Sequence, residues 1–185
     1  NLKIATSGPR RKAQLLGINS GFNIVPIRGN IQTRIDKMNT EKLDGLIVAK
    51  AALNRLKISH PNIYIFSEEE MLPAAAQGAI GIEVIKENLE TKTNNLLESI
   101  NDNLTFEATE IERAVVAALQ GNCLSPISAL CKIRDQDVEL KVRVSNQKGS
   151  EVYDQKEIFT LDNKIQALED FVEKLISNGA KTLIQ

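Results

Sequence analysis

The chain has 185 residues, 42% hydrophobic and 25% charged, so it suits one large globular domain or two small ones. A formal net charge of −1 argues against a general surface for nucleic acid or anionic membrane, because either usually needs a basic surplus. No run approaches the roughly 20 apolar residues of a membrane span. Two cysteines with a single histidine make neither a disulfide framework nor a zinc site, so we expect a cytoplasmic protein without a metal.

The first part of the chain alternates short apolar runs with helical patterns. Helices are expected from residue 9 to about 18, from 30 to about 39, and up to 56. Strands are expected at residues 2–5, 22–27, 44–49, 63–66 and 79–85. Strands separated by short helices usually pair in parallel. Ligands of such sheets bind at the carboxyl ends of the strands, where the arginine-bearing turns described below are found.

The second part has a different pattern. Residues 86–103 are polar and read as a connecting segment, and a helix is expected at 104–119. Extended segments follow at residues 126–133, 138–144 and 151–159, and a closing helix at 162–177. The sequence therefore predicts an α/β unit followed by an α+β unit, the latter a small three-stranded antiparallel sheet covered by helices.

An arginine-rich turn follows the first expected strand, in residues 6–11 (Thr-Ser-Gly-Pro-Arg-Arg). Pro9 suits the first position of a helix, and Ser7 or Gly8 suits its cap. The N-terminus of a helix offers free N–H groups and the positive end of its dipole to a carboxylate or phosphate. A capped helix with solvated arginines would explain the same residues, so this turn alone does not establish a ligand.

A second such turn, residues 28–34, follows the second expected strand. Gly29 permits a backbone turn that a Cβ would obstruct, Asn30 can cap the next helix, and Arg34 lies one helical turn beyond it. Arginine presents a planar fork that binds a carboxylate through two hydrogen bonds. Five of the eight arginines fall in the first 55 residues, and this clustering favours an anion-binding cleft over two simply capped helices.

The third candidate is the loop of residues 120–127, which contains Cys123. The loop lies between the end of a helix and the start of a strand, where the negative end of the helix dipole works against a low pKa for the thiol. A protease-type nucleophile is therefore not expected. Considered by itself, Cys123 reads most simply as a small apolar thiol, as does Cys131 in its apolar strand.

Taken together, these segments resemble the porphobilinogen deaminase (hydroxymethylbilane synthase) family. The resemblance is carried by the two arginine turns and the cysteine loop, in that order along the chain. It also includes DGLIVA at residues 44–49, LNRL at 53–56, LPA, QGA and GIE between 72 and 83, and ER at 112–113. It extends over nearly the whole chain and is weakest after Ile133.

The resemblance implies a fold of three domains, of which this chain would supply two. Residues 1–85 would form the second domain, similar to half of a periplasmic-binding-protein-like module, with a strand returning to the first domain. Residues 86–103 would connect it to the third domain, residues 104–185. The third domain would carry Cys123 on a mobile loop, with a dipyrromethane cofactor attached through a thioether. Four porphobilinogen units would be joined in turn with loss of ammonia, and water would release the linear hydroxymethylbilane.

The same resemblance implies which residues hold the pyrroles. Each pyrrole carries an acetate and a propionate, so a growing polypyrrole needs cations around it. Arg28 also matches a position linked in the family to the loss of ammonia. The positions that match side-chain-binding residues of the family are Thr6, Ser7, Arg10, Arg11, Arg28, Asn30, Arg34 and Arg55.

Some positions depart from the family pattern. Gly8 and Pro9 replace a serine and an aliphatic residue, Lys50 and Ala52 replace a small residue and a glycine, and Asn122 replaces the glycine before the cysteine. The essential aspartate of the family belongs to its first domain, and its motif does not occur in this sequence. We therefore expect a fragment of a monomeric enzyme, inactive alone. Its expected partners are the missing N-terminal domain, porphobilinogen and the growing polypyrrole, with neither nucleic acid nor membrane.

Two alternatives stay open at this stage. A non-enzymatic organic-anion-binding module of the periplasmic-binding type, fused to a small α+β domain, would explain the arginine turns but not the cysteine loop. A degenerate relative that keeps the fold without turnover is the other, supported only by Lys50 and Asn122. A stable pyrrole adduct on Cys123 would distinguish the enzyme from the binding module.

Overall fold

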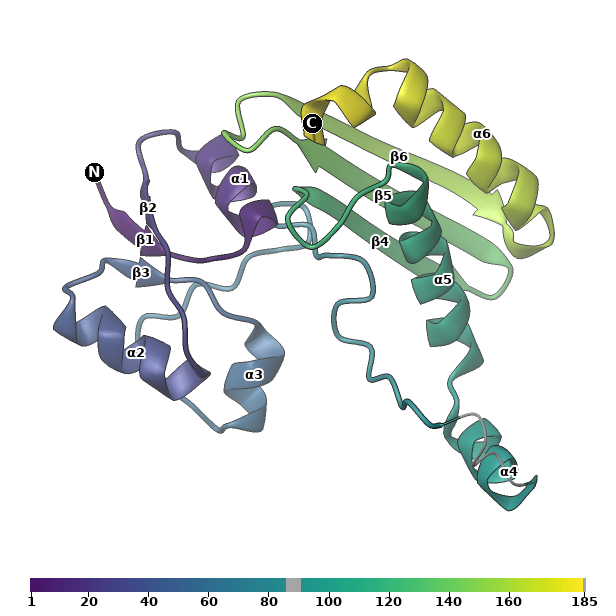
Figure 1. Cartoon of the computed structure of the whole chain (residues 1–185), viewed down its shortest axis with the longest axis horizontal. Coiled ribbons are helices and arrows are strands. Elements are labelled where there is room, and N and C mark those ends of the chain that lie inside the picture. Colours follow the sequence, from purple (N-terminus) through teal and green to yellow (C-terminus); the bar gives the residue numbers. More distant parts are fainter. Residues whose placement is uncertain (86–90, 185) are drawn as a thin grey trace.

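The computed structural model describes residues 1–85 and 91–184, and Figure 1 shows two regions, each with its own small sheet. The first region is a three-stranded parallel sheet in the order β2-β1-β3. Its elements are β1 (Lys3–Ala5), α1 (Pro9–Ile18), β2 (Asn23–Val25), α2 (Ile31–Thr40), β3 (Gly45–Leu46) and α3 (Lys50–Arg55). The expected alternation of strand and helix is thus confirmed up to residue 56, and so is the parallel pairing.

The register of the parallel sheet brings the two arginine turns to one edge. Ala5 of β1 lies opposite Val25 of β2 and Leu46 of β3, so the strands end at the same level. The chain leaves β1 and β2 at this edge, which is where an α/β sheet binds its ligands. Few side chains hold the region together, because α2 and α3 contribute no fully buried residue. The buried apolar residues are Ala5, Ala13, Leu15, Ile27 and Leu72.

The strands expected at residues 63–66 and 79–85 are wrong for this structure. Both segments are irregular and pair with no strand in the described part of the chain. Their large apolar side chains are exposed: Ile63, Tyr64, Ile65, Ile80, Ile82, Val84 and Ile85. A strand needs a neighbour to bond its backbone N–H and C=O groups, and apolar alternation shows only which face should be buried.

The second region confirms the expected α+β unit. A three-stranded antiparallel sheet in the order β4-β5-β6 is covered by two long helices (Figure 1). Its elements are α5 (Asn103–Ala118), β4 (Ile127–Arg134), β5 (Asp137–Ser145), β6 (Val152–Thr160), the 3₁₀ turn η2 (Leu161–Asn163), α6 (Lys164–Ser177) and the 3₁₀ turn η3 (Ala180–Ile184). None of the helices in the described residues is long and apolar enough to cross a membrane.

The main hydrophobic core lies between this sheet and its helices. Alternate residues of β5 are fully buried, as the strict apolar–polar alternation of that strand predicts: Val138, Leu140, Val142 and Val144. They pack in one cluster with residues of α5 and α6, among them Val115, Phe171 and Leu175. Each such side chain contributes about 1.5–3 kcal/mol through burial, so this cluster supplies most of the stability of the second region.

One helix was not expected. The sequence predicts a polar connection over residues 86–103, yet α4 (Thr91–Ile100) occupies most of it, while residues 86–90 lie outside the described residues. Leu96 and Ile100 of α4 are exposed. The limits of the two expected domains therefore stay a prediction.

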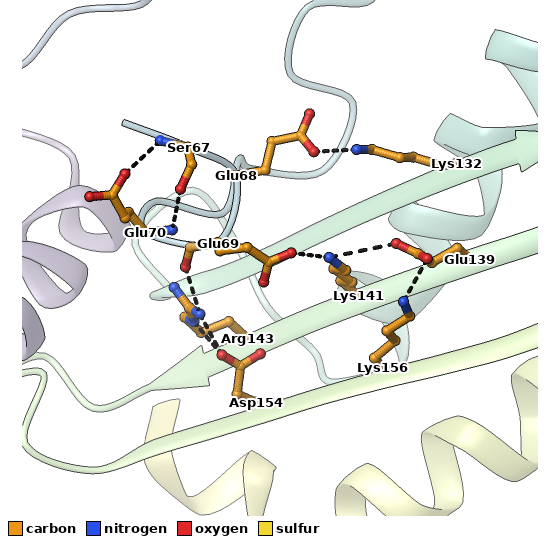
Figure 2. A network of polar contacts seen from close by, with 10 residues as sticks. All are labelled: Ser67, Glu68, Glu69, Glu70, Lys132, Glu139, Lys141, Arg143, Asp154 and Lys156. Carbon is orange, nitrogen blue, oxygen red and sulfur yellow. Dashed lines mark hydrogen bonds and ion pairs between the residues drawn. The ribbon is translucent and has the colours of Figure 1, made fainter. Parts of the chain in front are cut away.

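Polar contacts join the first region to the outer face of the second sheet, as Figure 2 shows. Glu68 pairs with Lys132 of β4, and Glu69 pairs with Lys141 of β5. Arg143 donates from its Nη2 to the carbonyl oxygen of Glu69 at 3.1 Å. Exposed ion pairs contribute only about 0–1 kcal/mol each, so we assign this network a part in orientation more than in stability.

A buried joint lies beside this network and is centred on Gln14 of α1. Its Nε2 donates to the carbonyl oxygen of Leu72 at 3.0 Å and to Ser128 Oγ of β4 at 3.1 Å. Its Oε1 accepts from Leu72 N at 2.8 Å and from Arg143 Nη1 of β5 at 3.0 Å. All four hydrogen-bonding positions of the amide are used, so α1 is fixed to the second sheet at its middle.

Candidate functional site

The two arginine turns are bonded to each other through Ser7. Its hydroxyl accepts a hydrogen bond from Ile27 N at 2.8 Å and donates one to the carbonyl oxygen of Ile27. Ile27 is buried and immediately precedes Arg28. The hydroxyl that the family resemblance assigns to ligand binding therefore also holds the Arg28 turn beside the start of α1.

The N-terminus of α1 is open to an anion. Gly8 is the cap residue and offers no side chain to the free N–H groups, Pro9 takes the first helical position, and no acidic residue lies in the first turn. The positive end of the dipole is therefore not compensated within α1. Thr6, which is only 4% exposed, lies directly before this end.

Arg10 points inward, although the sequence groups it with the other arginines. It is buried, and its guanidinium donates to the carbonyl oxygen of Leu72 and, at 3.1 Å, to Gln77 Oε1. Burial, with a smaller contribution from the charge of Arg11, lowers the pKa of Arg10 to about 10. Its contacts tie α1 to the segment that follows Leu72.

Arg11 and Arg34 bring positive charge together from the two turns. Burial lowers the pKa of Arg11 below its ordinary value, and the charge of Arg34 lowers it further. Arg34 is held by a hydrogen bond of 2.7 Å from its Nε to the carbonyl oxygen of Gly29. Asn30 caps α2, since its Oδ1 accepts from Thr33 N at 2.9 Å. The mutual repulsion of Arg11 and Arg34 is the cost that a bound carboxylate would offset.

A cavity of about 460 Å³ lies where these turns meet the cysteine loop. Its walls come from the turn after β1, the first turn of α1, the end of β2, the cysteine loop and the turn between β5 and β6. The lining residues are Thr6, Ser7, Gly8, Pro9, Lys12, Ile24, Pro26, Arg28, Leu124 and Gln147. The cavity therefore brings three expected site residues, Thr6, Ser7 and Arg28, next to the residue that follows Cys123.

The cysteine loop is a compact turn built around Asn122. Its Oδ1 accepts from Leu124 N at 2.8 Å, and its backbone N–H donates to Ser125 Oγ at 3.1 Å. Cys123 lies at the exposed tip. Asn122, a departure from the family pattern, thus has a structural part, because its amide orders the turn that presents the thiol.

The second cysteine differs sharply from the first. Cys131 is buried in β4, and burial, helped by the nearby charge of Glu112, raises the pKa of its thiol to about 12. Glu112 of α5 is itself buried and accepts from Cys131 N at 2.8 Å and from Ala76 N at 2.6 Å. Cys131 is therefore an inert core thiol, as its sequence position suggested.

The remaining expected site residues do not line the cavity, and Cys123, next to the lining residue Leu124, is among them. Two of them, Arg10 and Arg11, lie at the start of α1, and two others, Asn30 and Arg34, lie at the start of α2. Arg55 is exposed in the last turn of α3. Sequence reasoning missed Lys12 and Gln147. Lys12 could have been found, because it lies one helical turn beyond Gly8, whereas Gln147 sits in a hairpin turn with no signal for this location.

Comparison with known proteins identifies two domains of one family in this chain. Residues 1–93 match the family model described as porphobilinogen deaminase, dipyromethane cofactor binding domain, and residues 106–175 match the model of the C-terminal domain of porphobilinogen deaminase. These two matches span both regions of the fold.

Individual relatives carry the same name. The chain is 34% identical over 185 residues to a porphobilinogen deaminase of Campylobacter lari, covering 99% of this chain and 59% of the relative. It is 39% identical over 155 residues to that of Clostridium novyi, covering 82% and 51%, and 45% identical over 130 residues to that of Clostridium acetobutylicum, covering 70% and 44%. The chain thus spans roughly half the length of these relatives, and it belongs to the porphobilinogen deaminase family.

Proposed function

We propose that this chain is the cofactor-bearing part of an enzyme that joins four porphobilinogen units head to tail into hydroxymethylbilane, in tetrapyrrole biosynthesis. The observation that carries the proposal is the cavity itself. It is lined by residues of both arginine turns and by Leu124, the neighbour of Cys123. An exposed thiol beside a cationic cavity is the arrangement that a covalently attached, carboxylate-rich cofactor requires.

The residues present fit dipyrromethane. Small-molecule sites usually have volumes of about 300–1,000 Å³, and the cavity of about 460 Å³ falls within that range. Its lining contains the cations Lys12 and Arg28 and no acidic residue. Bound to Cys123 through a thioether, dipyrromethane would supply the terminal pyrrole to which porphobilinogen units are joined. Thr6, Ser7 and Arg28 would hold its carboxylates within the cavity.

The arginines around the cavity would serve the substrate and the growing product. Arg28 is exposed at the cavity wall and would orient the incoming porphobilinogen so that its aminomethyl nitrogen leaves as ammonia. Arg11, Arg34 and Asn30 lie beside the helix starts and would bind the acetate and propionate groups that accumulate. Arg55 would do so at the end of α3. Arg10 would act through its hydrogen bonds to Leu72 and Gln77, which support the first turn of α1.

The rest of the enzyme would come from a segment outside this sequence. Residues 1–85 would form a periplasmic-binding-like second domain and residues 104–185 the third, in a monomer. The exposed apolar residues of 79–85, such as Ile80 at 84% and Ile82 at 59%, suit a strand that pairs with that segment. The same segment would supply the catalytic aspartate, so the chain alone would be inactive. The partial coverage of the relatives supports this arrangement.

Intact mass and peptide mapping of the full-length protein test the proposal. We expect a mass excess equal to two linked pyrroles, located on Cys123. The variant Cys123→Ala should lose both the adduct and the synthesis of hydroxymethylbilane, while the control Cys131→Ala should keep the adduct on Cys123. An unmodified Cys123, still unmodified after incubation with porphobilinogen, would refute the proposal and favour a non-enzymatic anion-binding module.

A further inference from the structure

One wall of the cavity consists of residues to which the family resemblance assigns no part. Lys12 lies near the start of α1, and Gln147 comes from the turn between β5 and β6. They are 135 positions apart in the sequence, yet they line the same space. The role of this wall follows from its charge, from how Gln147 is held, and from another polar residue of the same lining.

Lys12 is an available cation. Its residue is exposed, and its ammonium makes no ion pair or hydrogen bond with the described residues. Arg28 is the other charged residue of the lining, and no carboxylate of the cavity neutralises either of them. Two cations at one cavity without a counter-ion favour an anionic ligand with more than one carboxylate.

Gln147 is held against the cavity by a close contact between the hairpin and α1. Gly149 has a φ of +67°, and a Cβ at this position would come within 2.0 Å of the carbonyl oxygen of Ala13. The turn is also braced by Asn146, whose Oδ1 accepts from Lys148 N and Ser150 N, both at 3.2 Å. The position of Gln147 is therefore fixed relative to Lys12, because both depend on the placement of α1.

The cavity also contains an unused polar group. Thr6 is only 4% exposed, and its hydroxyl makes no hydrogen bond with any described residue. No fully enclosed side-chain oxygen or nitrogen in the described residues lacks a partner, so this hydroxyl is reached from the cavity. A largely buried hydroxyl of a residue that lines a cavity is suited to bond a ligand there.

We propose that Lys12 and Gln147 bind a carboxylate of the pyrrole attached nearest to Cys123 and so determine how readily this protein takes up its cofactor. The proposal rests on the proposed function above. Adjacent Cα atoms are about 3.8 Å apart, so Leu124 in the cavity wall brings the ring next to Cys123 within reach of this wall. Lys12 supplies the charge, and the Gln147 amide adds a neutral hydrogen bond.

The experiment measures how fast apo full-length protein acquires the two-pyrrole adduct on Cys123 from porphobilinogen, by intact mass. Lys12→Met should slow loading about tenfold, as expected for the loss of a charge-assisted hydrogen bond. Gln147→Ala should slow it about threefold, and Lys12→Arg should restore loading. Raising the salt concentration should slow the unsubstituted protein more than Lys12→Met. The matched control is Lys148→Met, which removes an exposed lysine of the same hairpin that does not line the cavity.

The outcomes separate this inference from the function on which it rests. Slow loading in Lys12→Met and Lys12→Gln, at an unchanged Tm, supports it. The inference is overturned if Lys12→Met, Lys12→Gln and Gln147→Ala all acquire the adduct at the rate of Lys148→Met. In that case the adduct on Cys123 of the unsubstituted protein still supports the proposed function. If the unsubstituted protein acquires no adduct, the proposed function fails, and this inference fails with it.

Discussion

Replacing Glu112 by glutamine perturbs the contact that joins the segment containing Ala76 to the core of the second region. Each of the two Glu112 oxygens accepts a backbone N–H, from Ala76 at 2.6 Å and from Cys131 at 2.8 Å. Glutamine keeps one acceptor oxygen and turns an NH₂ donor toward the other N–H, which is left unsatisfied. A lost charge-assisted bond and an orphaned buried N–H cost about 2–4 kcal/mol. The neutral amide recovers part of this, because the raised pKa of Glu112 shows that burying its charge is unfavourable.

We therefore expect Glu112→Gln to lower the free energy of unfolding by about 2 kcal/mol, and Tm by about 4–8 °C for a chain of this size. Glu110→Gln is the control, since Glu110 lies on the same helix, is exposed and pairs only loosely with Arg113 at 3.8 Å. Thermal unfolding followed by circular dichroism measures both variants. A Tm for Glu112→Gln within 2 °C of that of Glu110→Gln would show that the two amide contacts do not act as described.

The same substitution has a defined pH dependence. Burial raises the pKa of Glu112 above its ordinary value of 4.5 by more than the two amide hydrogen bonds lower it. The folded state therefore holds the proton more tightly than the unfolded state. The stability from this group is complete below pH 4.5 and is lost as pH rises through the folded-state pKa. The difference in Tm between the unsubstituted protein and Glu112→Gln should accordingly shrink as pH rises through that window.

Three further outcomes are expected. In the apo protein a thiol reagent should modify exposed Cys123 and should spare Cys131, whose pKa is raised to about 12, until the chain unfolds. Peptide mapping measures the labelling of each thiol, and equal labelling would contradict the burial of Cys131. Arg10→Met should reduce the free energy of unfolding by about 1–3 kcal/mol in urea titrations, and Arg113→Met, exposed on α5, by less than about 0.5 kcal/mol. Ala76→Gly should raise the free energy of unfolding by about 0.5–1 kcal/mol, because Ala76 has a φ of 56° that glycine adopts without strain. A loss of stability in this variant would oppose the explanation.

The second region could be predicted from sequence because its signals are local. Strict alternation in residues 138–144 predicts which face of β5 is buried. Apolar residues at helical spacing in 104–119 predict only part of the inner face of α5, since Ile111 and Val115 are buried but Phe106 is 54% exposed. The strands expected at 63–66 and 79–85 failed for the opposite reason. Pairing depends on a partner strand, and no strand of the described chain lies beside them.

The site was predicted in composition more than in arrangement. Arg10 and Arg11 are adjacent in sequence, but consecutive residues of a helix point about 100° apart. Arg10 therefore turns into the contact with Leu72, while Arg11 faces Arg34. The part of Gln147 was not predictable at all, because its location depends on how a distant hairpin packs on α1.

The walls of the cavity differ in how they are held, and this difference bears on how a growing polypyrrole is accommodated. Helix α1 is fixed at Gln14 by four hydrogen bonds and at Ala13 by the hairpin containing Gly149, so its first turn keeps its distance from the β5–β6 turn. The hydrogen bonds of residues 122–125, by contrast, run within the cysteine loop itself, through Asn122 and Ser125. Moving α1 would break buried bonds that cost about 1–3 kcal/mol each when left unmade. Moving the loop as a unit breaks none of these, so any enlargement of the cavity is expected on the side of Cys123.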